Sequence, residues 1–140
     1  MEPAALNAAM RPVLDALQVQ ELWTFPVEHC RKSYGLVVEG LAGWKFVFSG
    51  DTRPCDAVVD AAKGATLLVH EATFEDALKE DAETKRHSTV SEAVATGEKV
   101  AVFLIECGVS IIHAHRRGAS VPSSRISARG IPRSLCSSSP

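Results

Sequence analysis

The sequence predicts an α/β fold, and three observations on its 140 residues carry that prediction. Short apolar runs of strand length recur along the chain, with Gly or Pro turns between them. Helical patterns lie between several of these runs. The order of strand, loop and helix is that of half of an α/β sandwich, and it is not that of an all-helical protein.

The chain begins with a predicted helix over residues 2–18. Met10, Val13, Leu14 and Leu17 follow the i, i+3, i+4, i+7 spacing that places side chains on one face of a helix. The spacing therefore predicts one apolar stripe along this helix.

The clearest strand signal is a hairpin. Residues 34–39 and 44–48 are apolar runs of strand length, and the Gly-containing segment 40–43 between them predicts the turn. A short extended segment over 19–27 precedes the hairpin. Pro26 cannot donate a hydrogen bond to a neighbouring strand, so it favours a sheet edge or a strand end at that point.

The second half of the chain alternates helices and strands. We expect, in order, a helix over 55–63, a strand over 66–70, a charged helical or irregular excursion over 75–86, a helix over 90–99 and strands over 100–105 and 109–112. Pro54 and Gly64 suit the first turn and the end of the first of these helices. Thr89 and Glu92 fit a capping box, in which the two side chains bind the first free amides of a helix reciprocally.

Composition and charge limit the class of protein. The formal net charge of −2 gives no global basic field of the kind that marks a nucleic-acid partner, although a sum does not reveal a local patch. No apolar run approaches the roughly 20 residues that span a bilayer. The first ten residues lack the pattern of a secretory signal. The four cysteines form no CxxC pair, so we expect a reduced, intracellular protein.

The character of the chain changes near its end. Residues 114–140 are rich in Ser, Arg and Pro, and their few apolar residues follow no period. We therefore predict a poorly ordered tail over 114–140. One folded domain over 1–113 is expected to precede it.

Several residues that bind metals or transfer protons follow the predicted strands. His29, Asp51, the pair His70 and Glu71, and His113 each come after an apolar run. We expect the strand ends to gather these side chains on one rim of a sheet, where catalytic groups are usually mounted. An imidazole nitrogen or a carboxylate at such a place suits zinc.

Asp51 has two interpretations. It follows the apolar run 44–48 and the turn residue Gly50, so its carboxylate can reach a metal ion or a reacting phosphate. It also lies before Pro54, where an Asp commonly closes an Asx turn or caps a helix. The local sequence does not separate these two roles.

Glu71 and His87 form the second candidate group. A carboxylate that binds one nitrogen of an imidazole orients the ring and raises its basicity, which suits proton transfer. The alternative is an ordinary surface ion pair, which contributes less than about 1 kcal/mol to stability.

Four segments of the chain together resemble tRNase Z, the zinc-dependent endonuclease that removes 3′ trailers from precursor tRNA. The segments are VEHC at 27–30, GWKFVFSGDTRPC at 43–55, ATLLVHEATFED at 65–76 and RHST at 86–89. The resemblance is to the carboxy-terminal part of the long form, and it runs from about Leu17 to Gly97. It implies a partial metallo-β-lactamase αββα sandwich, of which residues 1–113 form the second half only.

The resemblance also implies a role for each site residue. His29 corresponds to a ligand of one zinc, and Asp51 corresponds to the carboxylate that bridges two zinc ions. Glu71 and His87 resemble the pair that protonates the leaving 3′ oxygen. His113 is the candidate for the last zinc ligand, with His115 as its rival.

One motif of that family is not found in this chain. The family's His-x-His-x-Asp-His string, which supplies most zinc ligands, does not occur in residues 1–28. We therefore expect an incomplete two-zinc site, and a fragment or isoform that is inactive alone. The alternatives are another hydrolase of the metallo-β-lactamase fold and a non-catalytic binding protein derived from the nuclease.

The partners and the compartment follow from the same resemblance. Precursor tRNA is the expected substrate. One sheet face would lack its partner in half a sandwich, which predicts a homodimer or pairing with a full-length enzyme. Related long forms imply the nucleus or the mitochondrion, with the cytoplasm as an alternative.

Overall fold

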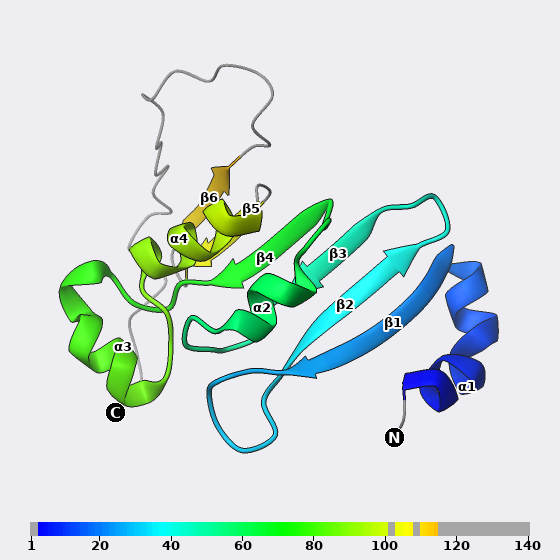
Figure 1. The fold of residues 1–140 in the computed structure, drawn as a ribbon, viewed down its shortest axis with the longest axis horizontal. Coiled ribbons are helices and arrows are strands. Elements are labelled where there is room, and N and C mark those ends of the chain that lie inside the picture. Colours follow the sequence, from blue (N-terminus) through cyan, green and yellow to red (C-terminus); the bar gives the residue numbers. More distant parts are fainter. Residues whose placement is uncertain (1–2, 101–102, 108–109, 115–140) are drawn as a thin grey trace, which may run out of the picture.

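The structure is a computed structural model that describes residues 3–100, 103–107 and 110–114. A single six-stranded sheet runs through these residues in the spatial order β1-β2-β3-β4-β5-β6 (Figure 1). The strands are β1 (Val19–Pro26), β2 (Tyr34–Gly40), β3 (Lys45–Phe48), β4 (Leu67–Glu71), β5 (Phe103–Cys107) and β6 (Ser110–Ala114). The helices are α1 (Pro3–Ala16), α2 (Asp56–Ala61), η1 (Asp76–Leu78), α3 (Lys79–Lys85) and α4 (Val90–Val100).

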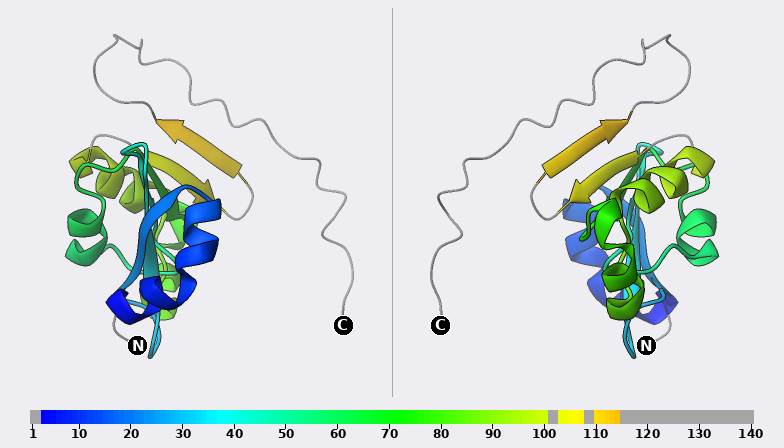
Figure 2. Two further views of the ribbon diagram at one scale, coloured as in Figure 1. Left: turned by 90° about the vertical axis from the view of Figure 1, so that its right-hand side faces the viewer. Right: turned by 90° about the vertical axis from the view of Figure 1, so that its left-hand side faces the viewer.

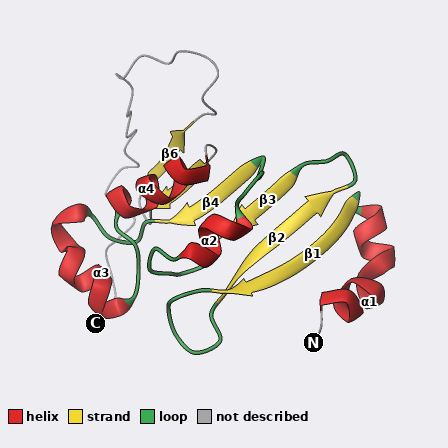
Figure 3. Cartoon of the chain, in the orientation of Figure 1, coloured by secondary structure: helices red, strands yellow, loops and turns green. Residues whose placement is uncertain are grey.

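The sheet is mixed, and its strand directions decide where the loops meet. β1, β2 and β3 form an antiparallel meander, whereas β3, β4 and β5 run parallel. The parallel pairs need crossovers, which α2 supplies between β3 and β4 and the helices η1, α3 and α4 supply between β4 and β5 (Figure 3). β6 turns back antiparallel to β5. The predicted hairpin over 34–48 is confirmed as the β2–β3 pair.

The core lies between the sheet and the two helices α2 and α4. Figure 2 shows these helices on one side of the sheet and α1 on the other. Val37, Val47 and Leu68 point from adjacent strands into this layer and are fully buried. Val58 of α2 meets them there, and the same cluster includes Ala62. Burial of this apolar surface holds the helices on the sheet.

The opposite face of the sheet is apolar and only partly covered. Side chains alternate along a strand, so the neighbours of the buried residues point to this face. In the strand register, Leu36 lies beside Phe48, and Phe48 lies beside Val69. Phe48 and Leu67 are each 37% exposed. Among the described residues, this face stays partly open, and it is the face at which half of a sandwich is expected to meet a partner.

Helix α1 covers the free edge of the sheet instead of packing through an apolar stripe. The Asn7 side chain binds both the amide and the carbonyl of Leu22 in β1, at 3.0 and 2.9 Å. Arg11 adds hydrogen bonds to the carbonyls of Val19 and Gln20. Such contacts block an edge strand from pairing with another chain.

The prediction of an apolar stripe on α1 is therefore wrong in part. Leu14 is buried, but Val13 and Leu17 are 52% and 65% exposed. The helix ends at Ala16, so Leu17 falls outside it. Polar contacts to the sheet edge set the orientation of the helix, and the spacing of its apolar residues does not.

The later elements match the prediction apart from their bounds. The capping box is present: the Thr89 amide donates to the Glu92 carboxylate at 3.0 Å, and the Glu92 amide donates to the Thr89 hydroxyl at 3.4 Å. The helix that it begins continues to Val100, which the sequence had placed in a strand. The charged excursion over 75–86 forms η1 and α3.

The predicted tail and domain boundary are not tested. Residues 115–140, including His115, lie outside the described residues, so the two-part organisation into 1–113 and 114–140 remains a prediction. Among the described residues, no helix has both the length and the apolar character needed to cross a bilayer.

Candidate active site

Three loops meet at one rim of the sheet because the strands before them run in the same direction. β1 and β3 are both antiparallel to β2, and β4 is parallel to β3. His29 follows β1, Asp51 follows β3, and Glu71 is the last residue of β4. The structure therefore brings these three predicted residues to the same edge.

His29, Asp51 and His87 form a cluster that can hold a metal ion. One ligand atom of each residue lies within 4.8 Å of the ligand atoms of the other two. Two atoms bound to the same zinc at about 2 Å each are at most about 4 Å apart, so a small closing movement satisfies the geometry. Two imidazoles and a carboxylate are ordinary zinc ligands.

The imidazole of His29 is oriented by a backbone carbonyl. Its Nδ1 lies 2.8 Å from the carbonyl oxygen of Arg86. A carbonyl only accepts, so Nδ1 carries the proton and Nε2 keeps its lone pair for a cation. The ring of His87 stands 4.6 Å away, centroid to centroid.

Asp51 is exposed and points into this cluster. Gly50 before it has φ +63, and a Cβ at that position would lie 2.7 Å from the Tyr34 carbonyl oxygen, so the turn requires glycine. The Asp51 carboxylate makes no hydrogen bond or ion pair with the part of the chain that the structure describes. Helix α2 begins after Cys55, which excludes the helix-cap interpretation of Asp51.

Glu71 has the opposite surroundings. It is 7% exposed, and its carboxylate accepts four hydrogen bonds. Oε1 accepts from the Thr52 amide at 2.8 Å and from His87 Nδ1 at 2.9 Å, and Oε2 accepts from the Thr73 amide at 2.9 Å and its hydroxyl at 2.7 Å. Burial alone would raise the pKa of Glu71. The hydrogen bonds from Thr52, Thr73 and His87 outweigh burial and lower the pKa below its ordinary value.

His87 joins the two groups. Its Nδ1 donates to Glu71, so its Nε2 is left for the cluster with His29 and Asp51. Its main chain is held as well, because its amide donates to the Ala82 carbonyl at 2.8 Å. The predicted contact between Glu71 and His87 is therefore present. The proton-transfer role of this pair remains a prediction.

The serines and threonines of the motifs hold the rim together, and sequence reasoning missed this role. The Ser88 hydroxyl donates to the Thr52 carbonyl at 2.7 Å. The Thr52 hydroxyl accepts from the Glu28 amide at 3.1 Å, and the Ser49 hydroxyl accepts from the Glu71 amide at 3.0 Å. Hydroxyls beside turns commonly bind nearby backbone, which was the available signal.

Arg53 ties the rim to helix α4. Its guanidinium forms a two-bond pair with Glu92, at 2.6 and 2.7 Å, and also donates to the His87 carbonyl at 2.6 Å. The hydrogen bond to Glu92 raises the pKa of Arg53, against the effect of burial. Nothing in the sequence indicated this contact, because the partners are 34 and 39 residues away.

His70 and His113 are not part of the cluster. His70 is fully buried, its Nδ1 donates to the Glu71 carbonyl at 2.6 Å, and burial lowers its pKa. We predicted His113 at the same rim, but the course of the backbone places it elsewhere. His113 lies within β6 opposite Leu104, and β6 runs away from the rim because it is antiparallel to β5. Its side chain is outside the described part, so its role as a ligand remains a prediction.

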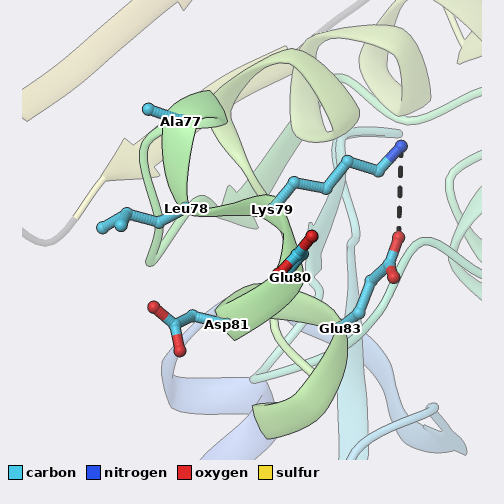
Figure 4. Close-up of a pocket in the computed structure, with 6 residues that line it drawn as sticks. All are labelled: Ala77, Leu78, Lys79, Glu80, Asp81 and Glu83. Atoms are coloured by element: carbon cyan, nitrogen blue, oxygen red, sulfur yellow. Dashed lines mark ion pairs between the residues drawn. The ribbon is translucent and has the colours of Figure 1, made fainter.

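The surface near the cluster is hollowed. A hollow of about 640 Å³ beside His29 is lined by Arg31, Arg53, Arg86 and other residues of the loops. A second hollow lies over η1 and α3 (Figure 4), where Lys79 and Glu83 form an ion pair at 4.0 Å. That second hollow contains no His or Cys, so it does not belong to the site.

Known proteins resemble this chain over most of its length. The mitochondrial protein tRNAse Z TRZ4 of Arabidopsis thaliana is 44% identical over 104 residues, which are 67% of this chain and 11% of that protein. Zinc phosphodiesterase ELAC protein 2 of Homo sapiens is 40% identical over 119 residues, which are 84% of this chain and 14% of that protein. The chain thus spans about one-seventh or less of these relatives. No family model matches the chain.

Solved structures share the fold. A long-form RNase Z from yeast has a TM-score of 0.63 and 27% identity, and the likeness covers 71% of this chain and 14% of that one. The metallo-β-lactamase fold protein YhfI from Bacillus subtilis has a TM-score of 0.53 at 17% identity, over 61% of this chain and 35% of that one. The predicted partial metallo-β-lactamase fold is confirmed by these likenesses.

Proposed function

We propose that this chain, which is homologous to part of the long-form tRNase Z proteins, carries one side of the active site of a zinc-dependent tRNA 3′-processing endoribonuclease. The observation that supports this best is the hydrogen-bonded pair of Glu71 and His87, at 2.9 Å, beside the His29 and Asp51 ligand atoms. Phosphodiester hydrolysis needs both a metal and a proton donor for the leaving oxygen.

The chain's own residues account for the proton. The hydrogen bonds that lower the pKa of Glu71 keep it ionised at neutral pH, so its carboxylate accepts the proton on His87 Nδ1 and orients the ring. His87 Nε2 then delivers a proton to the departing 3′ oxygen of ribose. His87 is 18% exposed at its side chain, so substrate can reach it while the ring stays oriented.

His29 and Asp51 are the residues that would hold zinc. When bound, zinc acidifies a water molecule and neutralises charge on the phosphate. The Asp51 carboxylate accepts no hydrogen bond from the described residues, so both of its oxygens would be available to the metal. His113 is the further candidate ligand. Zinc usually takes three or four protein ligands, and we propose that a second segment completes the site in the active enzyme.

A chimera tests the proposal directly. Residues 17–97 of this chain would replace the corresponding stretch of human zinc phosphodiesterase ELAC protein 2, and cleavage of a precursor tRNA would be measured. We expect cleavage, and a loss of at least about 100-fold on His87→Asn, which removes the proton donor. A folded, zinc-loaded chimera that leaves the precursor intact would overturn the proposal.

The isolated chain is expected to be a poor enzyme. Its described residues offer the cluster of His29, Asp51 and His87 and no His-x-His-x-Asp-His string. We expect the purified 140-residue protein to cleave precursor tRNA far more slowly than a complete enzyme. Robust cleavage that a chelator abolishes would contradict this part of the proposal and leave the assigned reaction in place.

The open face of the sheet is the proposed contact with a protein partner, either a second copy of this chain or a full-length enzyme. Its exposed Phe48 and Leu67 favour association because burial removes apolar area from water. Sedimentation of the isolated chain should show a dimer that Phe48→Ser weakens. Leu78→Ser, in η1 of the crossover between β4 and β5 and outside this face, is the control. An unchanged monomer for all three proteins would exclude self-association.

The mitochondrion is the proposed compartment, since the names of two Arabidopsis thaliana relatives place those proteins there. The names of these two relatives do not mention the nucleus. Fractionation of cells that express a tagged chain, with import-competent and import-blocked mitochondria, would test this location.

A further inference from the structure

We propose that Arg86 is a positioning residue for His29, and that it holds this histidine from two sides. The inference rests on the proposed role of His29 as a zinc ligand. His29 Nδ1 donates to the Arg86 carbonyl at 2.8 Å, and Arg86 Nη1 donates back to the His29 carbonyl at 2.9 Å. The two residues are 57 positions apart in the chain, so these bonds are tertiary.

The carbonyl of Arg86 selects one form of the His29 ring. Which imidazole nitrogen binds a metal is set by the hydrogen bond that the other nitrogen makes. With the proton held on Nδ1, Nε2 is the nitrogen that keeps a lone pair for a cation held with Asp51 and His87. Outer hydrogen bonds of this kind commonly change metal affinity by about 10- to 100-fold.

The guanidinium of Arg86 adds a tertiary hydrogen bond to the loop that carries His29, beside the bonds of Glu28 to Thr52 and Arg53. This loop connects β1 and β2 and follows no regular structure from Val27 to Ser33. A hydrogen bond to the His29 carbonyl fixes the main chain of the ligand itself. Ring and backbone are thus both bound to the same partner residue.

Arg86 can act as an anchor because its own backbone is fixed. It ends helix α3 in the left-handed conformation, with φ 58. Its amide donates to the Glu83 carbonyl, and the next amide donates to Ala82. Glycine is the usual residue in this conformation, and a side chain there costs about 1 kcal/mol or more. A bulky arginine at such a place is consistent with a use for its side chain.

A second arginine repeats the arrangement at the neighbouring histidine. Arg53 donates to the His87 carbonyl at 2.6 Å, as Arg86 does to the His29 carbonyl. Arg86 and His87 are consecutive residues, so the two arginine–carbonyl hydrogen bonds involve the same short segment. His29 and His87, whose rings are 4.6 Å apart, are therefore held as one unit.

The test uses Arg86→Gly in the full chain without metal. Glycine keeps the carbonyl and readily adopts the left-handed backbone, and it removes the side chain together with its guanidinium. Nitrogen NMR of the imidazoles should show His29 protonated at Nδ1 in the wild type. The variant should show a mixture of both tautomers, because without the bond to the His29 carbonyl the loop no longer holds the ring against the Arg86 carbonyl. Exchange of the amides in the loop 27–33 should accelerate by about tenfold or more, because the loop loses the hydrogen bond to the His29 carbonyl.

Arg31→Gln is the matched control. Arg31 lines the same hollow as Arg86 but makes no hydrogen bond or ion pair with any described residue. We expect its His29 tautomer and loop exchange to match the wild type. Arg86→Lys keeps the charge but loses the planar donor group, and it should behave like Arg86→Gly. It also replaces the glycine variant if that protein does not fold.

Zinc affinity gives the second readout. Competition with a chromogenic chelator should show zinc binding weakened by about tenfold in Arg86→Gly and unchanged in Arg31→Gln. The same tautomer and the same loop exchange in Arg86→Gly as in the wild type would overturn the inference. If the isolated wild type binds no zinc, as its incomplete ligand set allows, the NMR comparison decides the inference, because it is made without metal. The proposed function is tested separately by the chimera.

Discussion

Two carboxylates stand at the ends of the neighbouring parallel strands β3 and β4, and their surroundings are opposite. Glu71 is buried and accepts four hydrogen bonds, whereas Asp51 is exposed and accepts none from the described residues. A saturated carboxylate serves to orient its neighbours. A carboxylate with free oxygens is available to an ion. The same chemical group therefore has two roles at one rim, and its neighbours decide which.

The contrast between the two carboxylates is tested most strongly by replacing each of them with its amide. Glu71→Gln places an NH₂ group against donors of Thr52, Thr73 or His87, so we expect the free energy of unfolding to fall by about 2 kcal/mol. Asp51→Asn disturbs no partner, so its unfolding free energy should stay within about 0.5 kcal/mol of wild type. Urea denaturation at pH 7 measures both. Equal losses would show that the contrast has no energetic meaning.

The pH dependence of stability isolates Glu71. Hydrogen bonds lower its folded pKa, so the ionised form stabilises the fold at neutral pH. That contribution is complete above the unfolded pKa of about 4.3 and is lost as pH falls through the lower folded pKa. Denaturation of the wild type should therefore show a loss of stability below about pH 4.3. The loss should be smaller in Glu71→Gln, since the lowered pKa values of Asp76 and Glu92 act in both proteins.

Zinc affinity should depend more on Asp51 than on Glu71, which is the reverse of their order for stability. Asp51→Asn removes a ligand, and we expect zinc binding to weaken by at least about tenfold, which is about 1.4 kcal/mol. Glu71→Gln only alters the orientation of His87 and should have the smaller effect. Chelator competition on the folded variants measures this. A larger loss in Glu71→Gln would assign the metal to the buried side of the rim.

A smaller loss of stability is expected when Arg53, which binds Glu92 beside the site, is replaced. Arg53→Gln removes the partly buried two-bond pair with Glu92 and the hydrogen bond to the His87 carbonyl, and it should lower the free energy of unfolding by about 1 kcal/mol or more. Lys63→Gln is the control, because its ion pair with Asp60 is exposed to solvent and should have no measurable effect. Thermal unfolding of both variants decides the point. Similar shifts would show that burial of the pair adds nothing.

Local patterns predicted the elements better than their contacts. The β2–β3 hairpin and the capping box of Thr89 and Glu92 were predicted because their signals lie within a few residues. The stripe on α1 failed because polar bonds from Asn7 and Arg11 to a distant strand edge set the orientation of that helix. His113 was misplaced on the rim because the sequence does not state the direction of β6.

The sequence by itself determined the α/β class and the order of the motifs that carry His29, Asp51, Glu71 and His87. Patterns of apolar and turn residues act over short distances, so they can be read along the chain. Only the tertiary structure decided which carboxylate is saturated and which histidine nitrogen is free. Those properties depend on bonds such as that of His29 to Arg86, 57 residues away, and folding alone creates such neighbours.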